Sequence, residues 1–225
     1  MDSFAERIQM TTISFVPFLI AVIFHEYAHG RMAKYWGDQT AERAGRLTLN
    51  PVPHIDVMGT IVFPLIVMLT GTNFLFGWAK PVPINPTRFR KYRPGLFWVA
   101  IAGPGMNVIL AFFSAALLCI ILKWLPQSNF FHEPLKGMTV VSISLNYALA
   151  FFNLIPLPPL DGSKIVESFL SYNATKKYEA IAQYSFWILM ALMFTGAISI
   201  ISYPIRFCTE ITLGLMIHLF GLGGF

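Results

Sequence analysis

The sequence predicts an all-α polytopic membrane protein with about five transmembrane helices, a sixth left open, and one re-entrant segment. Composition is the first observation behind this class. The chain of 225 residues is 56% hydrophobic and only 12% charged, whereas soluble domains carry about 25% charged residues. A soluble monomer of this size could not cover so much apolar surface, and a disordered chain would contain fewer aromatic residues.

The second observation is the spacing of the charges, which leaves long uncharged stretches. A helix needs about 20 mostly apolar residues to cross the hydrocarbon core, so these stretches are the candidate spans. In chain order they are Ile8 to Phe24, Val57 to Ala79, Pro94 to Leu122, Gly137 to Leu160, Ala180 to Ile205 and Ile211 to Phe225. Lys and Arg collect between them, as in the cytoplasmic loops of membrane proteins. These loops account for the net charge of +5, so we expect the chain to have the lipid bilayer as a partner and to bind no nucleic acid.

The first stretch leads into a cluster of metal-binding side chains, His25-Glu26-Tyr27-Ala28-His29. A helix from about Phe15 to Trp36 would place His25 and His29 on one face, because residues four apart are neighbours. Glu26 would be turned by about 100° and could reach a metal-bound water without being a ligand. This is the HExxH pattern of zinc metalloproteases, and ionisable groups in a spanning segment are functional by default.

A catalytic zinc ion normally has three protein ligands and one water, so a third ligand must come from elsewhere. The candidates are His54, His132, His218, Asp56, Asp161, Glu167 and Glu210. Asp161 stands out because it ends the fourth uncharged stretch, directly after a run of prolines that should break the helix. Unwound backbone at membrane depth is tolerated only where protein or a polar cavity surrounds it. An ordinary helix N-cap or loop carboxylate at the membrane edge stays open as the alternative.

The topology follows if Asp161 and the two histidines meet at one depth. The helices that carry them must then run in the same direction, with Pro94 to Leu122 crossing back between them. The second stretch, interrupted by Gly59, Pro64 and Gly71, must therefore re-enter over residues 57–76 instead of spanning. The basic connections then lie in the cytoplasm. We expect a multi-pass protein of the cell (inner or plasma) membrane with its active site toward the cytoplasmic side.

The last two stretches complete the expected architecture. Ala180 to Ser202 should span outward, and Ile211 to Phe220 should either span back or lie in the interface. Together with the preceding elements they form a single membrane-embedded peptidase domain, residues 1–225. Within it we expect a catalytic core at 12–165, the re-entrant segment at 57–76 and C-terminal helices at 166–225.

Two motifs together resemble the site-2 protease family of intramembrane zinc metalloproteases. One is the HExxH segment, and the other is the NxxPxxxxDG-like run in which Asn153, Pro156, Asp161 and Gly162 match by type and spacing. The segment from Ala102 to Asn107 also resembles the start of an intervening core helix. The string Gly77 to Pro86 resembles a loop of the compact bacterial members. The resemblance covers roughly residues 12 to 165 and indicates the short type without a PDZ domain.

The resemblance implies a three-helix catalytic core and an endopeptidase that cleaves transmembrane segments of membrane protein substrates, as in regulated intramembrane proteolysis. One Zn²⁺ per chain would be held by His25, His29 and Asp161, with Glu26 as the general base. Asn153, and with less support Asn107, would bind the substrate backbone or the developing oxyanion. The alternative for Asn153 is a hydrogen bond between helices. The identity of the substrate and the oligomeric state stay open.

Other interpretations are also open at this stage. A different membrane metalloprotease would use a distant glutamate ligand such as Glu167, and a non-enzymatic metal-dependent membrane protein would not need Glu26. A di-iron oxygenase would need many more than the five histidines present. The segment Arg46 to Asn50 could form a strand that captures an unwound substrate, or an ordinary loop. The re-entrant segment and the loop from Gly77 to Pro86 could act as a gate or sheath around the site, or could simply connect elements and anchor at the interface.

Overall fold

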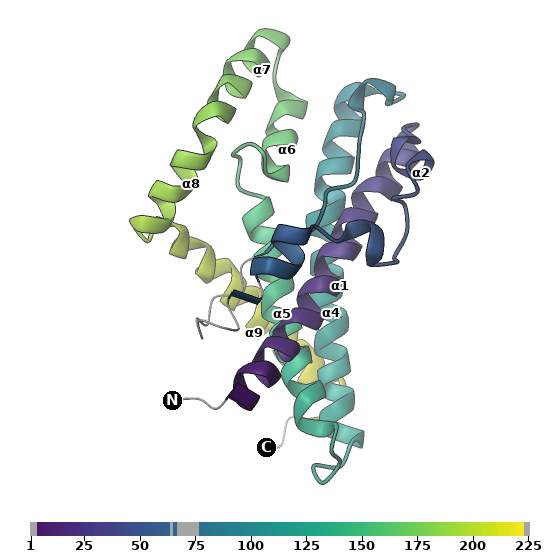
Figure 1. Ribbon diagram of the computed structural model, residues 1–225, viewed down its shortest axis with the longest axis vertical. Coiled ribbons are helices and arrows are strands. Elements are labelled where there is room, and N and C mark those ends of the chain that lie inside the picture. The colour runs from purple at the N-terminus through teal and green to yellow at the C-terminus, as the bar shows by residue number, and fades with distance from the viewer. Residues whose placement is uncertain (1–3, 64, 67–76, 223–225) are drawn as a thin grey trace.

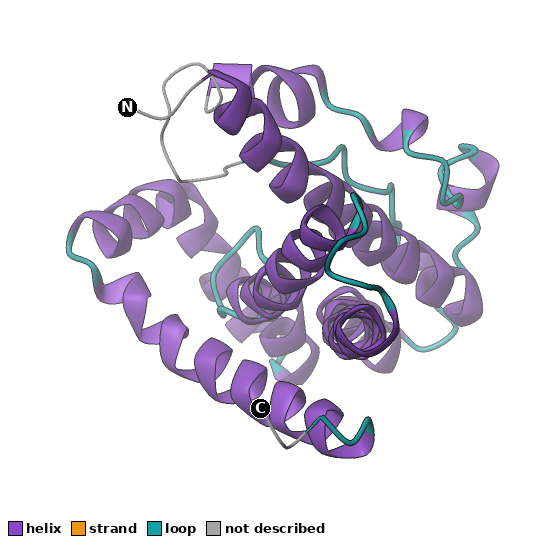
Figure 2. Ribbon diagram, turned by 90° about the horizontal axis from the view of Figure 1, so that it is seen from below, coloured by secondary structure: helices purple, strands orange, loops and turns teal. Residues whose placement is uncertain are grey.

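The computed structural model describes residues 4–63, 65–66 and 77–222, and these residues form helices and loops without a β-strand (Figures 1 and 2). Three long helices make the centre: α1 (Phe4–Trp36), α4 (Tyr92–Trp124) and α5 (His132–Asn153). In Figure 1, α1 and α5 run upward and α4 runs downward, and each of the three packs on the other two. The all-α class is confirmed, and α1 and α5 have the common direction that the meeting of the two motifs requires.

The centre of the bundle is held by close packing of α4 on α5. Ala111, Ala115 and Leu118 of α4 are buried against Ile143 and Tyr147 of α5. Small side chains let helix backbones approach closely, which is the main way that helices associate in a bilayer. The same cluster extends to α9 (Ser202–Leu219), where the hydroxyl groups of Tyr147 and Thr212 share a hydrogen bond.

The C-terminal part differs from the expected pair of spans. The stretch from Ala180 to Ser202 is divided into a 3₁₀ turn (Ala180–Tyr184), α8 (Ser185–Phe194) and a second 3₁₀ turn (Ala197–Ile201). The interruption falls at Gly196, whose φ of 71° is a left-handed conformation that glycine adopts without strain. The expectation of one continuous span at Ala180 to Ser202 is therefore wrong.

Among the described residues, four helices are long and apolar enough to cross a membrane, fewer than the five or six expected. They are Ile8–Trp36, Tyr92–Trp124, His132–Asn153 and Ala197–Leu219. The last of these reaches the far end of α4, where Nζ of Lys123 donates to the carbonyl of Phe220 at 2.7 Å. Both ends of the described chain accordingly lie at the lower end of Figure 1.

The connection between α1 and α4 carries short elements: α2 (Thr40–Arg43), 3₁₀ turns at Val52–His54 and Pro86–Arg88, and a π-helical turn at Val57–Val62. Part of the expected re-entrant segment lies outside the described residues, which omit 64 and 67–76. The described residues that flank it lie together, since the amide of Trp78 donates to the carbonyl of Gly59. This arrangement agrees with re-entry, which stays a prediction.

The segment from Arg46 to Asn50 is a loop, so of the two alternatives left open for it the structure shows the loop and not the strand. The reason is local turn chemistry. The hydroxyl of Thr48 accepts a hydrogen bond from the amide of Asn50, and the side chain of Asn50 accepts one from the amide of Val52. Side chains that bond the backbone two residues further along bend the chain and compete with extended structure.

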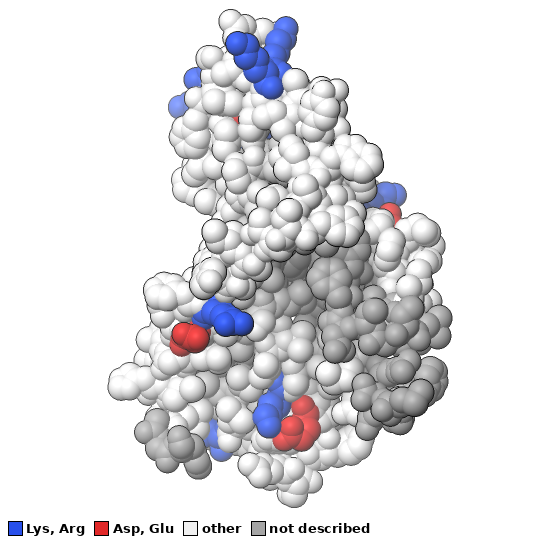
Figure 3. Space-filling model, turned by 90° about the vertical axis from the view of Figure 1, so that its left-hand side faces the viewer, with Lys and Arg blue, Asp and Glu red and all other residues white. Residues whose placement is uncertain are grey.

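Two shorter helices follow α5 at the upper end of Figure 1: α6 (Asp161–Phe169) and α7 (Tyr172–Glu179). The hydroxyl of Tyr178 donates to the carbonyl of Pro156, which ties α7 to the break before α6. The face in Figure 3 shows its charged side chains in a few small groups, with basic groups at the top, and uncharged atoms cover most of it. Such a surface suits contact with lipid.

Candidate metal centre

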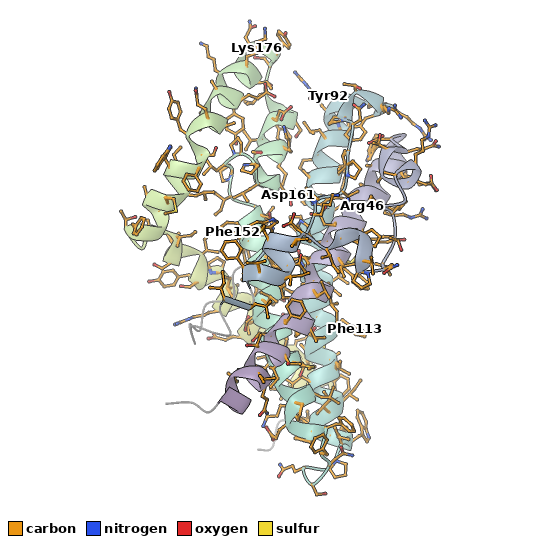
Figure 4. All side chains as sticks on the ribbon, in the orientation of Figure 1. Arg46, Tyr92, Phe113, Phe152, Asp161 and Lys176 are labelled. Carbon is orange, nitrogen blue, oxygen red and sulfur yellow. The ribbon has the colours of Figure 1, made fainter. Side chains whose placement is uncertain are left out.

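The structure brings His25 and His29 of α1 together with Asp161, the first residue of α6. The Nε2 atoms of the two histidines lie 3.0 Å apart. Each Nε2 lies 3.2 Å from Oδ2 of Asp161. Both imidazoles are buried, and these three side chains form a possible metal-binding group among the described residues. In Figure 4, Asp161 lies where the chain passes from α5 into α6, close to α1.

The other ring nitrogen of each histidine faces a hydrogen-bond acceptor. Nδ1 of His29 lies 2.7 Å from the carbonyl oxygen of Val99 in α4. A carbonyl can only accept, so Nδ1 of His29 carries the proton and Nε2 presents a lone pair. Nδ1 of His25 lies 2.6 Å from Oδ1 of Asn107, also in α4. Partners of this kind fix the tautomer and ring orientation of metal-binding histidines.

The orientation of Asn107 is fixed by its own partners. Its Nδ2 donates to the carbonyl of Ala21 at 3.3 Å and to Oδ1 of Asn146 at 2.9 Å. Nδ2 of Asn146 in turn donates to the carbonyl of Ser142, so the direction of the whole chain is set by carbonyl groups. Asn107 is fully buried and both of its N–H groups are used. The expected contact of Asn107 with substrate is therefore not supported, and the geometry gives it the task of orienting His25.

These partners leave three acceptors pointing at one another: two imidazole lone pairs and a carboxylate oxygen. Such a group is repulsive unless a cation or shared protons lie between its members. Four ligands at the usual zinc bond length of about 2.0–2.1 Å in a tetrahedron are separated by roughly 3.3 Å. The observed separations of 3.0–3.2 Å are close to this value. The donor set and its spacing therefore fit a zinc ion.

Protons could lie between the three side chains in place of a metal ion, so the pKa of Asp161 matters. Burial by itself would raise the pKa of Asp161, but hydrogen bonds with the imidazoles of His25 and His29 outweigh burial and hold that pKa below its ordinary range. The carboxylate is thus ionised at neutral pH even without a metal ion. Metal binding would displace only the protons on the imidazoles, so metal affinity should weaken as the pH falls.

Two glycines allow the helices to approach closely enough to build this group. A Cβ atom on Gly103 of α4 would lie 2.6 Å from Cε1 of His25 and would also overlap the ring of His29. A Cβ atom on Gly162 would overlap the carbonyl oxygens of Leu154 and Ile155 in the break after α5. Gly103 therefore makes room for the imidazoles, and Gly162 makes room for the turn that presents Asp161.

The three side chains face a cavity of about 330 Å³ that Glu26 also lines. Oε2 of Glu26 accepts a hydrogen bond of 2.7 Å from the amide of Val82. Asn153 lines the same cavity and donates one N–H to the carbonyl of Leu149 in its own helix. This leaves Glu26 and Asn153 with further hydrogen-bonding capacity toward the cavity, within the part of the chain that the structure describes.

The loop of residues 77–85, which we call the proline loop, is held over this cavity by charged side chains. Oδ2 of the buried Asp38 accepts from the amide of Asn85 at 2.6 Å. Arg46 donates to the carbonyls of Lys80 and Pro81 at 2.7 and 3.3 Å. Figure 4 shows Arg46 at about the same level of the bundle as Asp161. Sequence reasoning missed both anchors, because nothing in the chain marks Asp38 or Arg46 apart from other loop charges.

Three other candidates for a third ligand, Glu167, His54 and His132, have different partners. Glu167 accepts from the hydroxyl of Tyr92 and pairs with Lys164, so the alternative with a glutamate ligand is not supported. His54 contacts the carbonyl of Thr48, and His132 contacts that of Leu125. The N-cap alternative for Asp161 also fails, because its carboxylate faces the histidines.

Comparison with known proteins gives a consistent result. The sequence model of Peptidase family M50 matches residues 121–196, a range that contains Asp161. A Bacillus subtilis (strain 168) protein named "Putative zinc metalloprotease YwhC" is 36% identical over 205 residues, which cover 88% of this chain and 90% of the relative. No solved structure gives a significant match.

More distant relatives carry similar names. "Putative zinc metalloprotease Rip2" of Mycolicibacterium smegmatis is 26% identical over 80% of this chain and 66% of its own length. "Putative zinc metalloprotease MJ0611" of Methanocaldococcus jannaschii is 28% identical over 68% of this chain and 70% of its own length. The similarity thus extends from bacteria to an archaeon.

Proposed function

Because the chain belongs to peptidase family M50 and is a zinc metalloendopeptidase, we propose that it cleaves peptide bonds within transmembrane segments of membrane proteins. The observation that carries the proposal is the position of the candidate metal centre. It lies among helices that are long and apolar enough to span a bilayer, in a cavity shared by α1, α4 and the break after α5. A substrate that reaches this cavity must itself lie in or beside the membrane.

We assign the metal to His25, His29 and Asp161, with one Zn²⁺ per chain. When bound there, zinc supplies Lewis-acid chemistry by acidifying water and polarising the scissile carbonyl. The chain orients the two histidine ligands through hydrogen bonds to the ring nitrogen that does not face the metal. The carbonyl of Val99 and the side chain of Asn107 accept from the two Nδ1–H groups, so each Nε2 is presented to the metal in the correct tautomer.

Glu26 acts as the general base. One of its oxygens is held by the amide of Val82, which fixes the carboxylate at the wall of the cavity. The other oxygen takes a proton from the attacking water and passes it to the leaving amine. The rotation of about 100° from His25 along α1 brings Glu26 to the cavity without making it a ligand.

Asn153 is positioned to bind the unwound substrate. A spanning helix pairs all of its backbone groups internally, so the substrate must unwind before a peptide bond becomes accessible. Asn153 lines the cavity. Its second N–H and its carbonyl oxygen can form hydrogen bonds with the backbone of the unwound substrate. The proline loop covers the same cavity and acts as a gate, since it must shift for an extended segment to reach Glu26.

The basic residues that precede α4 orient the protein in our proposal. The segment that precedes α4 contacts the C-terminal end of α1, since the amide of Arg90 donates to the carbonyl of Trp36 at 2.8 Å. Its basic residues are Arg88, Arg90, Lys91 and Arg93. Cytoplasmic loops carry an excess of Lys and Arg, so this end of the bundle lies on the cytoplasmic side of the cell (inner or plasma) membrane. The active site then opens toward the cytoplasmic side.

The test is cleavage of a model transmembrane peptide by the purified protein in vesicles, compared between wild type and Glu26→Gln. The variant should retain one zinc ion per chain and lose cleavage by about 10²- to 10⁴-fold, because Gln cannot take a proton. Glu133→Gln is the matched control, since Glu133 is an exposed carboxylate at the opposite end of the bundle. Retained cleavage in Glu26→Gln would overturn the mechanism.

A further inference from the structure

A second cavity lies on the outside of the pair formed by α1 and α4. It is a groove of about 800 Å³, which we call the α1–α4 groove. Its floor is apolar and includes Ala28 and Met32 of α1 with Ile101, Gly105, Met106 and Ile109 of α4. A Cβ atom on Gly105 would meet no other atom within 4 Å, so this part of the floor is open space.

The groove is separate from the metal centre although it uses the same two helices. At about 100° per residue, Tyr27 and Arg31 of α1 point roughly opposite to His25 and His29. On α4, the groove takes the face of Ile101 and Gly105, whereas the metal centre takes the face of Val99, Gly103 and Asn107. The groove shares no lining residue with the cavity that contains Glu26.

The end of the groove nearest the loops carries positive charge without a partner. Arg31 and Arg90 line it, and in the part of the chain that the structure describes neither guanidinium has a hydrogen bond or an ion pair. Lys34 also lines the groove but is paired with Glu42. No acidic side chain is among the described residues that line it. This end therefore offers two uncompensated cations beside an apolar channel.

The length of the groove matches one leaflet of a bilayer. From Trp98 at its basic end to Ile109, α4 rises roughly 16 Å at about 1.5 Å per residue. Half of a hydrocarbon core is about 15 Å. Trp98 is about half exposed at the level where aromatic side chains commonly meet headgroups. Beyond the groove, Phe113 is largely exposed on α4 and continues the lipid-facing side toward the lower end of Figure 4.

We propose that the α1–α4 groove is a binding site for one anionic phospholipid. The headgroup phosphate pairs with Arg31 and Arg90, and the acyl chains lie along the floor past Gly105 to Ile109. Basic pockets between transmembrane helices are a general way to bind anionic headgroups. Since the lipid contacts both helices, it holds together the pair that carries the histidines and their acceptors, and its loss should lower the thermal stability.

A substrate helix fits the groove less well than acyl chains. A phospholipid with an anionic headgroup carries its phosphate to the level of Arg31 and Arg90, beside an apolar floor. A transmembrane segment need not carry an anionic group at that level. Charge complementarity therefore favours the lipid.

The site is tested by counting lipids on the purified full-length protein with native mass spectrometry, after exposure to phosphatidylglycerol or phosphatidylcholine. Wild type should retain one phosphatidylglycerol and no phosphatidylcholine. Arg31→Gln combined with Arg90→Gln should bind phosphatidylglycerol about 30-fold more weakly, from about fivefold per cation. Arg88→Gln is the matched control and should bind as wild type does, because Arg88 is exposed nearby but does not line the groove.

A second variant tests the floor without changing charge. Gly105→Leu should fill the open space and exclude the acyl chains while zinc content and both arginines are retained. The proposal is overturned if wild type holds both lipids equally, if Arg88→Gln weakens binding as much as the double variant, or if Gly105→Leu binds phosphatidylglycerol unchanged. It is also overturned if a photo-cross-linker at position 106 captures a transmembrane peptide in place of phospholipid.

Discussion

Gly103 gives a sharp prediction, because a single methyl group there should weaken metal binding without replacing any of the ligands. A Cβ atom would lie 2.6 Å from Cε1 of His25, and ordinary contact begins at 3.4 Å. The imidazole must therefore retreat by about 0.8 Å, whereas metal–ligand distances tolerate about 0.2 Å. We expect Gly103→Ala to weaken zinc binding by at least about 100-fold, the upper end of what loss of a supporting contact costs.

The assay is competitive titration of zinc with a chelator on the purified protein. Gly105→Ala is the matched control, since it lies two residues further along the same helix and its Cβ atom meets nothing within 4 Å. Both variants gain helix propensity by about 1 kcal/mol, so a difference between them reports the contact with the imidazoles. Full zinc affinity in Gly103→Ala, or equal loss in both variants, would refute the reasoning.

Two further predictions concern residues that support the site. Asn107→Ala should weaken zinc binding by about 10- to 100-fold in the same titration, because Nδ1–H of His25 loses its acceptor, and unchanged affinity would contradict that role. Asp38→Ala should leave zinc content unchanged but expose the proline loop to limited proteolysis and reduce peptide cleavage, because the amide of Asn85 loses a buried partner worth about 1–3 kcal/mol. A loop as resistant to protease as in wild type would show that Asp38 does not anchor it.

The sequence predicted the elements whose signal is periodic or compositional. The α-helical class and the long helices followed from uncharged stretches and helical spacing. These features depend on the hydrophobic effect and on backbone geometry, which act residue by residue along the chain. The approach of Asp161 to His25 and His29 was implied by the resemblance to the site-2 protease family, and the direction of α4 followed from the requirement that these residues meet.

The supporting contacts could not be predicted in the same way, because they depend on how the helices are rotated against one another. Asn146 was missed although Ser142 and Asn146, four residues apart in an apolar run, mark one polar face of α5. The carbonyl of Val99 carries no signal in its side chain at all. The proline loop was seen as a motif, but its amide contact with Glu26 is a property of the folded chain.

The C-terminal region shows a different limit. Hydropathy marked a continuous apolar stretch from Ala180 to Ile205 but not the break at Gly196, where the chain turns through a left-handed conformation. A single glycine between apolar residues is a weak signal, since glycine is also tolerated inside transmembrane helices. The expectation of one continuous span at Ala180 to Ser202 was wrong for this reason.

The most direct test of the central claim is the zinc content of Asp161→Asn compared with Glu167→Gln. Both variants replace a buried or half-buried carboxylate of α6 with its amide of the same shape. We predict that wild type and Glu167→Gln bind one zinc ion per chain and that Asp161→Asn binds markedly less than one. A full equivalent of zinc in Asp161→Asn, or its loss in Glu167→Gln, would contradict the assignment of His25, His29 and Asp161 as the metal centre.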